Sequence, residues 1–588
     1  MVEEKVEPRE FNWRQLFPWT ELFQGFRIAL DLNKLLLAAA GIVVMAIGWW
    51  VLANVFYYPK PIFKDYSRVS DESPEERNNR AWADYKRDLA KWTLMHKAAG
   101  PGPTEIPIED LADSYDEYVE LSEGKGTPEQ RAQLAKEHFL PGGTLRTLPW
   151  NEDRGPNPFL LVTGKSGVPW EAGHFWDWLL TRELPVLIEP LYKLLQPVGY
   201  FIDPRSGALG KLYFLLVLIW TAATWALFGG AITRIAAVQI ARQEKIGMRE
   251  ALRYTLARYL HYLSAPIFPL IFVAVLLIIM IVFGLFGMIP ILGDIFVYGI
   301  FWPIIVLLGL GMAVALIGLV GWPMMSATIS TEGTDSWEAV SRSYSYVFQA
   351  PWHFAWYCLV ALGYGAVVVF FVGFVGSLTV DLAKWGVRQT PFVTTKTVNR
   401  DPVFLFVYAP KSFGWRQLLL REAFNSAGTP LVSSNGEIND TAYDQFLKEM
   451  SWWNKAGAVL VSGFWLNLIF LMIVGFGYSY FWSSSTIIYM LMRRKVDDAD
   501  LDEVYMEEDD QLEPPTYTAP SASAPAPAGA PSNMVEAPSL RVPPAPAPQP
   551  AATGAGSGDS GPSPSGLTPS APPSTSDGNA PSNPTGNP

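Results

Sequence analysis

The chain has 588 residues, of which 49% are hydrophobic and 14% aromatic, while only 17% are charged. An average soluble protein carries about 25% charged residues, so this composition argues against a soluble protein and indicates a membrane protein. The net charge of −12 argues against nucleic-acid binding, which needs a basic surface, and a single cysteine, Cys358, excludes an intrachain disulfide and a cysteine-based zinc site.

Six apolar stretches are long enough to cross a membrane, which takes roughly 20 residues of helix. The first is no cleavable signal peptide, because it begins too far from the N-terminus and lacks a small-residue cleavage site. The sixth is longer than a bilayer requires, so we expect it to tilt or to continue beyond the bilayer. The predicted spans are residues 35–58, 212–233, 262–289, 295–320, 354–380 and 456–492.

Lysine and arginine residues near the span ends predict the orientation. The segment between spans two and three carries six of them, and Arg493, Arg494 and Lys495 follow span six. Both segments should therefore face the cytoplasm, with both termini inside. The segment between spans four and five agrees only weakly, since Arg342 is its one basic residue.

These spans predict an all-α polytopic membrane protein with a mixed α/β extracytoplasmic loop domain and a disordered C-terminal tail. In the first outer loop, Ser73 and Glu76 are spaced as a capping box that begins a helix, and 127–130 repeats the pattern. Residues 156–163 are the best strand candidate. The predicted parts are a cytoplasmic amphipathic segment (1–34), the first span (35–58), the first outer loop (59–211), spans two to five with their cytoplasmic segments (212–380), the second outer loop (381–455), the sixth span (456–492), a basic-then-acidic segment (493–512) and the tail (513–588).

Two of these parts have an open interpretation. Residues 175–195 are rich in Trp and Leu and are broken by prolines. They suit either an interfacial segment on the outer leaflet or an ordinary packed helix of the loop domain. The tail 513–588 consists mainly of Pro, Ala, Ser and Gly, too little apolar material to fold. It could bind a partner as polyproline helix, but we expect a passive tether.

The segments after spans two and four resemble each other. Glu250 and Glu338 each begin a Glu-Ala pair that follows a glycine, Gly247 or Gly333, and precedes the next span. Internal symmetry of this kind is common in transporters. Whether this similarity is a true repeat stays open at the level of sequence.

The sequence offers little catalytic chemistry. None of the six spans carries a charge in its middle, where an ionisable residue usually marks function, so ion-coupled transport is disfavoured. Residues 162–167 contain Gly-Lys-Ser but lack the earlier glycine of a phosphate-binding loop, since Phe159 holds that place. His261 and His353, which precede spans three and five, fit interfacial polar residues better than a site. We therefore expect no enzyme activity, no catalytic, cofactor-binding or metal-binding residues, and no cofactor.

Spans four and five are rich in glycine, which allows helices to approach closely. We expect these glycines to serve packing, either between the two spans or at a homo-oligomer face, rather than to line a pore. They are Gly309, Gly311, Gly318, Gly321, Gly363, Gly365, Gly373 and Gly376.

Three stretches, 17–23, 151–158 and 332–339, together resemble a family of uncharacterised bacterial multipass inner-membrane proteins. The resemblance covers roughly residues 10–495. The repeated Glu-Ala segments are also similar, more loosely, to membrane domains appended to bacterial lipid-metabolism enzymes. Neither resemblance implies a reaction or a catalytic residue.

The leading hypothesis is thus a non-enzymatic membrane scaffold or assembly component of the cell envelope. Its partners would be the lipid bilayer and proteins that contact the outer loops and the tail, with no nucleic acid. The alternative is a transporter or channel subunit for a neutral or lipid-like substrate, which would need an open, partly hydrated cavity. A third hypothesis, an enzyme at the membrane surface, depends only on the two histidines with nearby Glu250 and Glu338.

Overall fold

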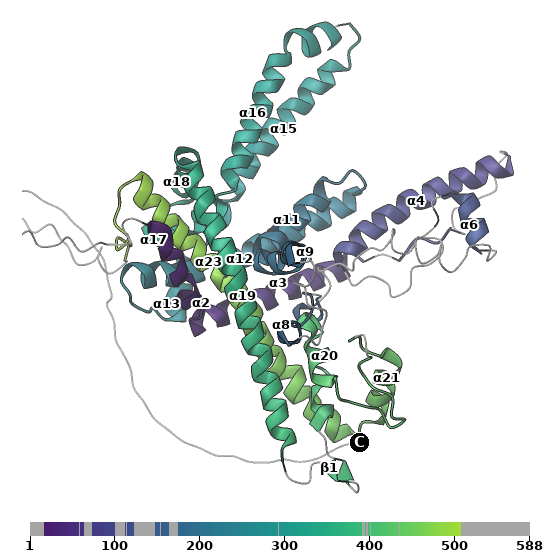
Figure 1. Cartoon of the computed structure of the whole chain (residues 1–588). Helices are drawn as coiled ribbons and strands as arrows, with labels where there is room; N and C mark the ends of the chain where they lie inside the picture. The colour runs from purple at the N-terminus through teal and green to yellow at the C-terminus, as the bar shows by residue number, and fades with distance from the viewer. Residues whose placement is uncertain are drawn as a thin grey trace, which may run out of the picture. The chain divides into compact units, whose positions relative to one another are not determined.

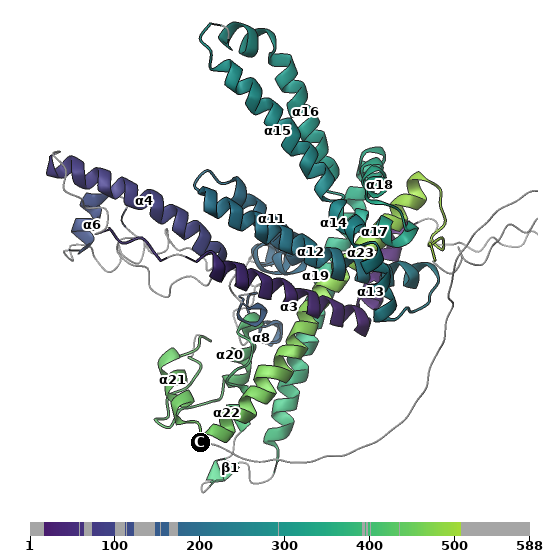
Figure 2. The same cartoon turned by 180° about the vertical axis from the view of Figure 1, so that it is seen from behind.

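The computed structural model describes the chain from Phe17 to Met506, apart from short segments in the loops (Figures 1 and 2). The predicted tail 513–588 and the predicted helix start at 127–130 lie outside the described residues. The described ranges are 17–57, 59–63, 73–99, 112, 114–122, 148–152, 154–163, 175–291, 293–390, 394–395, 398–399, 402–433 and 436–506.

Six helical stretches are long and apolar enough to cross a membrane, which confirms all six predicted spans. The helices of spans two, five and six extend past both predicted limits, those of spans one and three begin and end earlier than predicted, and that of span four is shorter. Prolines interrupt the third span, which breaks before Ile267, and begin α16 and α19. The stretches are α3 (Leu32–Val55), α12 (Ala208–Ala241), α14 (Tyr259–Ser264) with α15 (Ile267–Gly287), α16 (Trp302–Leu319), α19 (Pro351–Arg388), and α22 (Trp452–Ala458) continued by η9 (Val459–Leu466) and α23 (Asn467–Val496).

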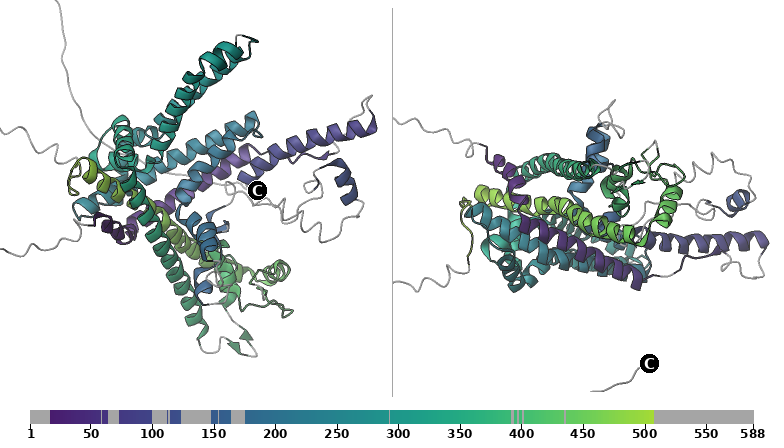
Figure 3. Two further views of the ribbon diagram at one scale, coloured as in Figure 1. Left: turned by 45° about the horizontal axis from the view of Figure 1, so that its top comes forward. Right: turned by 90° about the horizontal axis from the view of Figure 1, so that it is seen from below.

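Helices α3, α12 and α23 pack against one another and form the centre of the protein, and α19 packs on α23 (Figure 3). Aromatic rings fill this centre. Trp225 of α12 stacks on Tyr478 of α23 with ring centroids 4.7 Å apart. Trp49 of α3 donates a 2.8 Å hydrogen bond to Thr221, so its indole N–H is satisfied in a buried place.

Helices α15 and α16 run side by side as a hairpin joined by the π-helical turn η6 (Gly293–Ile300) (Figures 1 and 2). Only 6% of the apolar window of the third span and 11% of that of the fourth are buried inside the protein. In a membrane protein such faces contact lipid or the helices of another protein.

The glycines of spans four and five do not all serve one interface. A Cβ at Gly318 would meet Tyr344, and one at Gly376 would meet Ile473 of α23. Gly309 and Gly363 have open space beside them. The glycines with near neighbours thus mostly pack these spans against other elements rather than against each other.

The described part of the first outer loop is helical. The capping box is confirmed, because Ser73 accepts a hydrogen bond from the Glu76 amide at 3.4 Å and donates one to its carboxylate at 2.8 Å. The predicted strand at 156–163 is wrong, and the described residues of 59–211 contain no strand. Asn157 caps a short helix there, as its side chain accepts from the amides of Phe159 and Leu160. The elements are α4 (Pro74–Ala99), α6 (Tyr115–Ser122), η3 (Pro149–Asn151) and α8 (Pro158–Val162).

The proline-broken stretch before span two forms a series of short helices that pack against the spans. α11 contacts α12 and α23, and α10 contacts α19 and α23. The segment is thus helical, and it packs against three spans. Its elements are α9 (Phe175–Trp178), the π-helical turn η5 (Leu179–Glu183), α10 (Leu184–Leu187) and α11 (Glu189–Ile202).

The second outer loop packs into the same apolar core as the spans, since Trp415 and Leu431 are buried in it and Trp415 contacts Phe470 of α23 edge-on. Two strands of two residues each pair antiparallel, with Thr394 opposite Asn399. Asn439 caps α21 through the amide of Ala442. The elements are β1 (Thr394–Thr395), β2 (Val398–Asn399), η7 (Pro402–Phe406), η8 (Ser412–Gly414), α20 (Trp415–Leu420) and α21 (Asp440–Glu449).

Short helices also gather at the side predicted to face the cytoplasm. α13 and α18, which carry Glu250 and Glu338, each lead into the next span, so the two similar segments occupy similar places in the helix order. The described residues after α23, Asp497–Met506, return over this side, and we call them the C-terminal clasp. The helices are η1 (Pro18–Gln24), α2 (Gly25–Ala29), α13 (Met248–Ala257), α17 (Trp322–Glu332) and α18 (Ser336–Gln349).

The C-terminal clasp is held by backbone and side-chain contacts. The Tyr505 amide donates to the Thr331 carbonyl at 2.8 Å, and Arg234 donates to the Tyr505 carbonyl at 2.8 Å. Gly333 ends α17 with φ of 69°, and a Cβ there would lie 2.7 Å from the Tyr505 ring. This glycine therefore serves both the left-handed turn and the close approach of the clasp.

Candidate functional site

Four charged side chains from the first outer loop meet in the interior. Arg154 forms an ion pair with Glu152 at 2.6 Å and with Glu189 at 2.8 Å, and Lys193 pairs with the same two carboxylates at 2.8 and 2.6 Å. The side chains are only 4–8% exposed. We call these two anions and two cations the charge cluster.

The guanidinium of Arg154 is fully engaged. Its five hydrogen bonds go to the two carboxylates, to the Pro149 carbonyl at 2.6 Å and to the Ser412 hydroxyl at 2.9 Å. An arginine side chain has five N–H donors, so none remains for another ligand. Because Ser412 belongs to the second outer loop, the cluster joins the two outer loops.

The elements around the cluster fix its position. Asn157, three residues after Arg154, caps α8 with its oxygen and donates through its nitrogen to Ser377 of α19 at 3.1 Å and to the Phe413 carbonyl at 2.9 Å. Glu189 begins α11, and Lys193 follows one turn later on the same face. The Tyr478 hydroxyl of α23 donates to Glu189 at 3.2 Å. Spans five and six thus hold the outer-loop charges in place.

The contact with Tyr478 shows how deep the cluster lies. Tyr478 stands fifteen residues before Arg493 on α23, about 22 Å along the helix axis. A hydrocarbon core is about 30 Å thick, so a membrane whose boundary lies near Arg493 contains the cluster. With the boundary at that place, the protein would hold charge at membrane depth, although the charged residues come from outside the spans.

Mutual pairing is what allows these charges to stay ionised. Burial alone would raise the pKa of Glu189, but the facing Arg154 and Lys193 outweigh it and hold that pKa well below its usual value. Burial would lower the pKa of Arg154, but the Glu189 and Glu152 charges raise it above its usual value. Buried charges are stable only when paired in this way.

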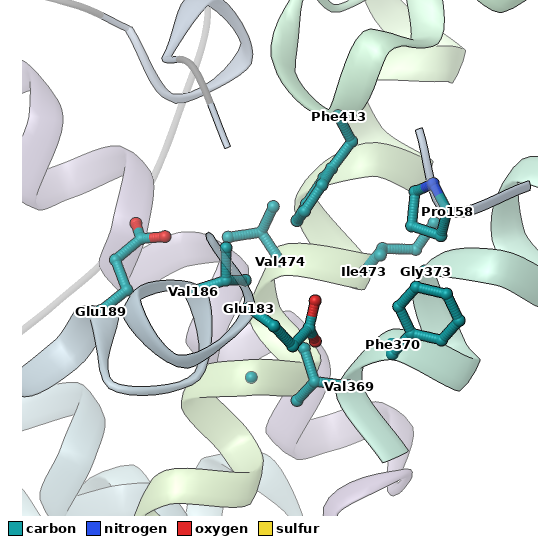
Figure 4. Close-up of a pocket in the computed structure, with 11 residues that line it drawn as sticks. Pro158, Glu183, Val186, Glu189, Val369, Phe370, Gly373, Phe413, Ile473 and Val474 are labelled. Atoms are coloured by element: carbon teal, nitrogen blue, oxygen red, sulfur yellow. The ribbon is translucent and has the colours of Figure 1, made fainter. Parts of the chain in front are cut away.

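A second carboxyl, Glu183, lies close to the cluster but outside its pairing (Figure 4). The residue is 7% exposed, and its Oε1 is buried without a hydrogen-bond partner in the described part of the chain. Burial raises the pKa of the Glu183 carboxyl to about 8. A desolvated carboxyl prefers its neutral form, so Glu183 holds a proton at neutral pH unless a cation joins it.

Glu183 lines a small cavity that contains about 20 Å³ in which the centre of a water molecule can lie, enough for about one water. Its carboxyl points toward Ile473 of α23 and Phe370 of α19, and Phe413 closes the opposite wall (Figure 4). The other lining residues are Pro158, Val186, Glu189, Val369, Gly373, Val474 and Gly477.

The residues considered from sequence do not form a site in the described structure. Glu338 pairs with Arg342 at 2.8 Å, and His353 packs edge-on against Tyr357 with ring centroids 6.4 Å apart. Val162 ends α8 and lies before the Gly-Lys-Ser motif, which lies outside the described residues. Cys358 is a partly buried thiol in α19.

Sequence reasoning missed the charge cluster because it looked for buried charge only within the spans. One signal was present: Glu189 and Lys193 are spaced i, i+4 in a Trp- and Leu-rich stretch, which is unusual unless the charges have partners. Glu152 and Arg154 lie in one of the stretches that carry the family resemblance. Their partners could not be identified, because Ser412 and Tyr478 lie more than 250 residues away.

In the described ranges no three His, Cys, Asp or Glu side chains are grouped to hold a metal ion. Comparison of the chain with protein-family models, curated proteins and solved structures gave no match. The resemblance to bacterial multipass inner-membrane proteins therefore stays a prediction. The six helices long and apolar enough to cross a bilayer establish the class: the chain is an integral multi-pass membrane protein in contact with lipid.

Proposed function

We propose that the protein is a non-enzymatic scaffold or assembly component of the cell envelope, held in the bacterial inner membrane with both termini in the cytoplasm. The charge cluster is the observation that carries this proposal. Its two anions and two cations are engaged with one another, with Ser412 and with Tyr478. Such a cluster fixes the outer loops to the spans and stiffens a platform rather than binding a substrate.

The exposed faces of the spans support the same proposal. The α15–α16 hairpin buries little of its apolar surface within the chain, so it can pack against helices of other membrane proteins. The outer loops on one side and the tail on the other would reach proteins in two compartments.

A transporter or channel for a neutral or lipid-like substrate is the competing function. It requires a hydrated path between the spans, whereas the cavity beside Glu183 has room for about one water. Two roomier hollows are lined mainly by the second outer loop and by residues at the ends of α2 and α12. The packed aromatic centre formed by Trp225, Tyr478 and Trp482 favours the scaffold.

The test is purification in mild detergent of the full chain and of a chain that ends at Glu513, followed by mass spectrometry of co-eluting proteins and reciprocal purification from each partner. The scaffold predicts a defined set of envelope proteins that depends on the tail or the outer loops and returns in the reciprocal experiment. Specific substrate flux in proteoliposomes of the purified protein would overturn it.

A further inference from the structure

The carboxyl of Glu183 has no counterion in the described structure. The charge cluster beside it is already balanced, because Arg154 and Lys193 face Glu152 and Glu189. The described residues that α8, α19 and α23 contribute to the cavity are apolar, and Glu189 is the other ionisable group on the lining. An ionised Glu183 therefore has no counterion among the described residues that line the cavity.

The cavity restricts the size and kind of that cation. Its room, about 20 Å³ for the centre of a water molecule, suits a group as small as water or a primary ammonium. A metal ion would need several oxygen ligands, whereas the described residues show no group of three ligating side chains. Phe370 and Phe413 on the walls offer aromatic rings, which favour an organic cation.

The surroundings indicate that the cation would carry an apolar body. Leu180, one turn before Glu183, is 58% exposed, and Phe371, next to Phe370, is 52% exposed. A bilayer that reaches this level would bring acyl chains against these exposed side chains. A ligand that reaches Glu183 from the lipid would leave its apolar part on this surface.

We propose that Glu183 and the cavity between α10, α19 and α23 bind the primary ammonium group of a lipophilic amine, with the Glu183 carboxylate as counterion. Two sources supply this chemistry, an aminophospholipid headgroup and a free long-chain amine. This site is additional to the proposed scaffold function. Either proposal can fail without the other, because ligand binding and partner binding are measured in separate experiments.

The first test uses purified full-length protein and measures its melting temperature with dodecylamine, dodecanol or dodecyltrimethylammonium, each below micelle-forming concentration. Dodecylamine should stabilise the protein, whereas dodecanol lacks the charge and the trimethylammonium head is too large for the cavity. Stabilisation should increase from pH 6 to pH 8.5, because Glu183 then loses its proton while an alkylamine stays protonated. Equal effects of all three compounds, or none from dodecylamine, would overturn the proposal.

Three variants locate the effect. Glu183→Gln should weaken dodecylamine binding about tenfold or more, because a charge-assisted hydrogen bond is lost. Gly477→Ala keeps the carboxyl but adds a methyl to the cavity lining, where the nearest atom is 4.0 Å away, and should also weaken binding. Glu120→Gln, on the exposed face of α6, is the matched control. Binding that is unchanged in both Glu183→Gln and Gly477→Ala would contradict the assignment.

The two sources are separated in nanodiscs. Native mass spectrometry of protein from phosphatidylethanolamine nanodiscs should show a retained lipid that Glu183→Gln loses, if the headgroup is the ligand. If a free amine is the ligand, dodecylamine should stabilise the protein equally in nanodiscs with and without phosphatidylethanolamine. Retention of phosphatidylglycerol or phosphatidylcholine to the same degree as phosphatidylethanolamine, without an effect of dodecylamine, would reject the amine site.

Discussion

Arg154 and Glu189 meet through two parallel hydrogen bonds, from Nε to Oε2 and from Nη2 to Oε1, each 2.8 Å long. This bidentate geometry is the strongest form of an arginine–carboxylate pair. It joins a loop residue to the first turn of α11, and Tyr478 ties the same carboxylate to the last span.

Removal of one partner from this pair should destabilise the protein severely. Arg154→Met leaves Glu189 and Glu152 with Lys193 alone, and breaking a buried pair costs about 3–5 kcal/mol. Thermal unfolding in detergent, followed by size-exclusion chromatography, measures the effect. The control Arg205→Met breaks an exposed pair with Asp203, which should cost less than about 1 kcal/mol. Equal stability of the two variants would show that the cluster does not hold the fold.

The stability of the wild type should depend on pH through Glu183. Its pKa is about 8 in the folded protein against 4.5 for the free side chain, so the folded state binds the proton more tightly. The contribution of Glu183 to stability is then greatest below about pH 4.5 and falls as pH rises toward 8, by at most about 1.4 kcal/mol per pH unit. Glu183→Gln should remove this component when the unfolding midpoint is measured from pH 5 to pH 8.5. An identical pH profile in the variant would place the titration elsewhere.

Close packing of α23 on α3 should make Gly475 intolerant of a side chain. A Cβ there would lie 3.1 Å from the Leu35 carbonyl oxygen and 3.3 Å from the Ala39 amide nitrogen, both backbone atoms that cannot easily move. We expect Gly475→Ala to lose about 1–3 kcal/mol through overpacking. Gly363→Ala, with open space around it, should be neutral. The melting temperatures of the two variants decide the point, and a tolerated Gly475→Ala would contradict the packing.

The C-terminal clasp should contribute to stability, whereas the chain after it should not. Truncation after Asp498 removes the contacts of Tyr505 with Thr331 and Arg234 and should cost on the order of 2 kcal/mol, since hydrogen bonds to charged groups are among the stronger ones. Truncation after Met506 keeps these contacts and should leave the melting temperature unchanged. Equal losses in the two truncations would mean that the clasp contributes nothing of its own.

The sequence was sufficient to predict the spans but not the site. Uninterrupted apolar length identifies a span without knowledge of its neighbours, which is why all six helices were found. The helix cap at Ser73 was also predictable, because it depends on residues close together in the sequence. At 156–163 the apolar pattern suggested a strand, but Asn157 and Pro158 favour a helix start, and the helix formed.

The candidate site escaped prediction because it is made by tertiary contact. The charges of Glu189 and Lys193 are visible in the sequence, but their burial depends on the packing of α11 against α12 and α23. Nothing in the sequence distinguishes Glu183 from the other carboxyl residues, because its enclosure depends on the folded positions of Phe370 and Phe413. Periodicity and composition do not identify contacts between residues that lie far apart in the sequence.

The long separation between the cluster and Tyr478 has a consequence for biosynthesis. Glu152, Arg154, Glu189 and Lys193 are translated before most of the spans, while Tyr478 belongs to the last one. The hydrogen bond from the Tyr478 hydroxyl to the Glu189 carboxylate therefore cannot form until nearly the whole membrane part of the chain has left the ribosome. A nascent chain stalled before α23 would present an incomplete ionic centre to the bilayer, a state that quality-control proteases could recognise.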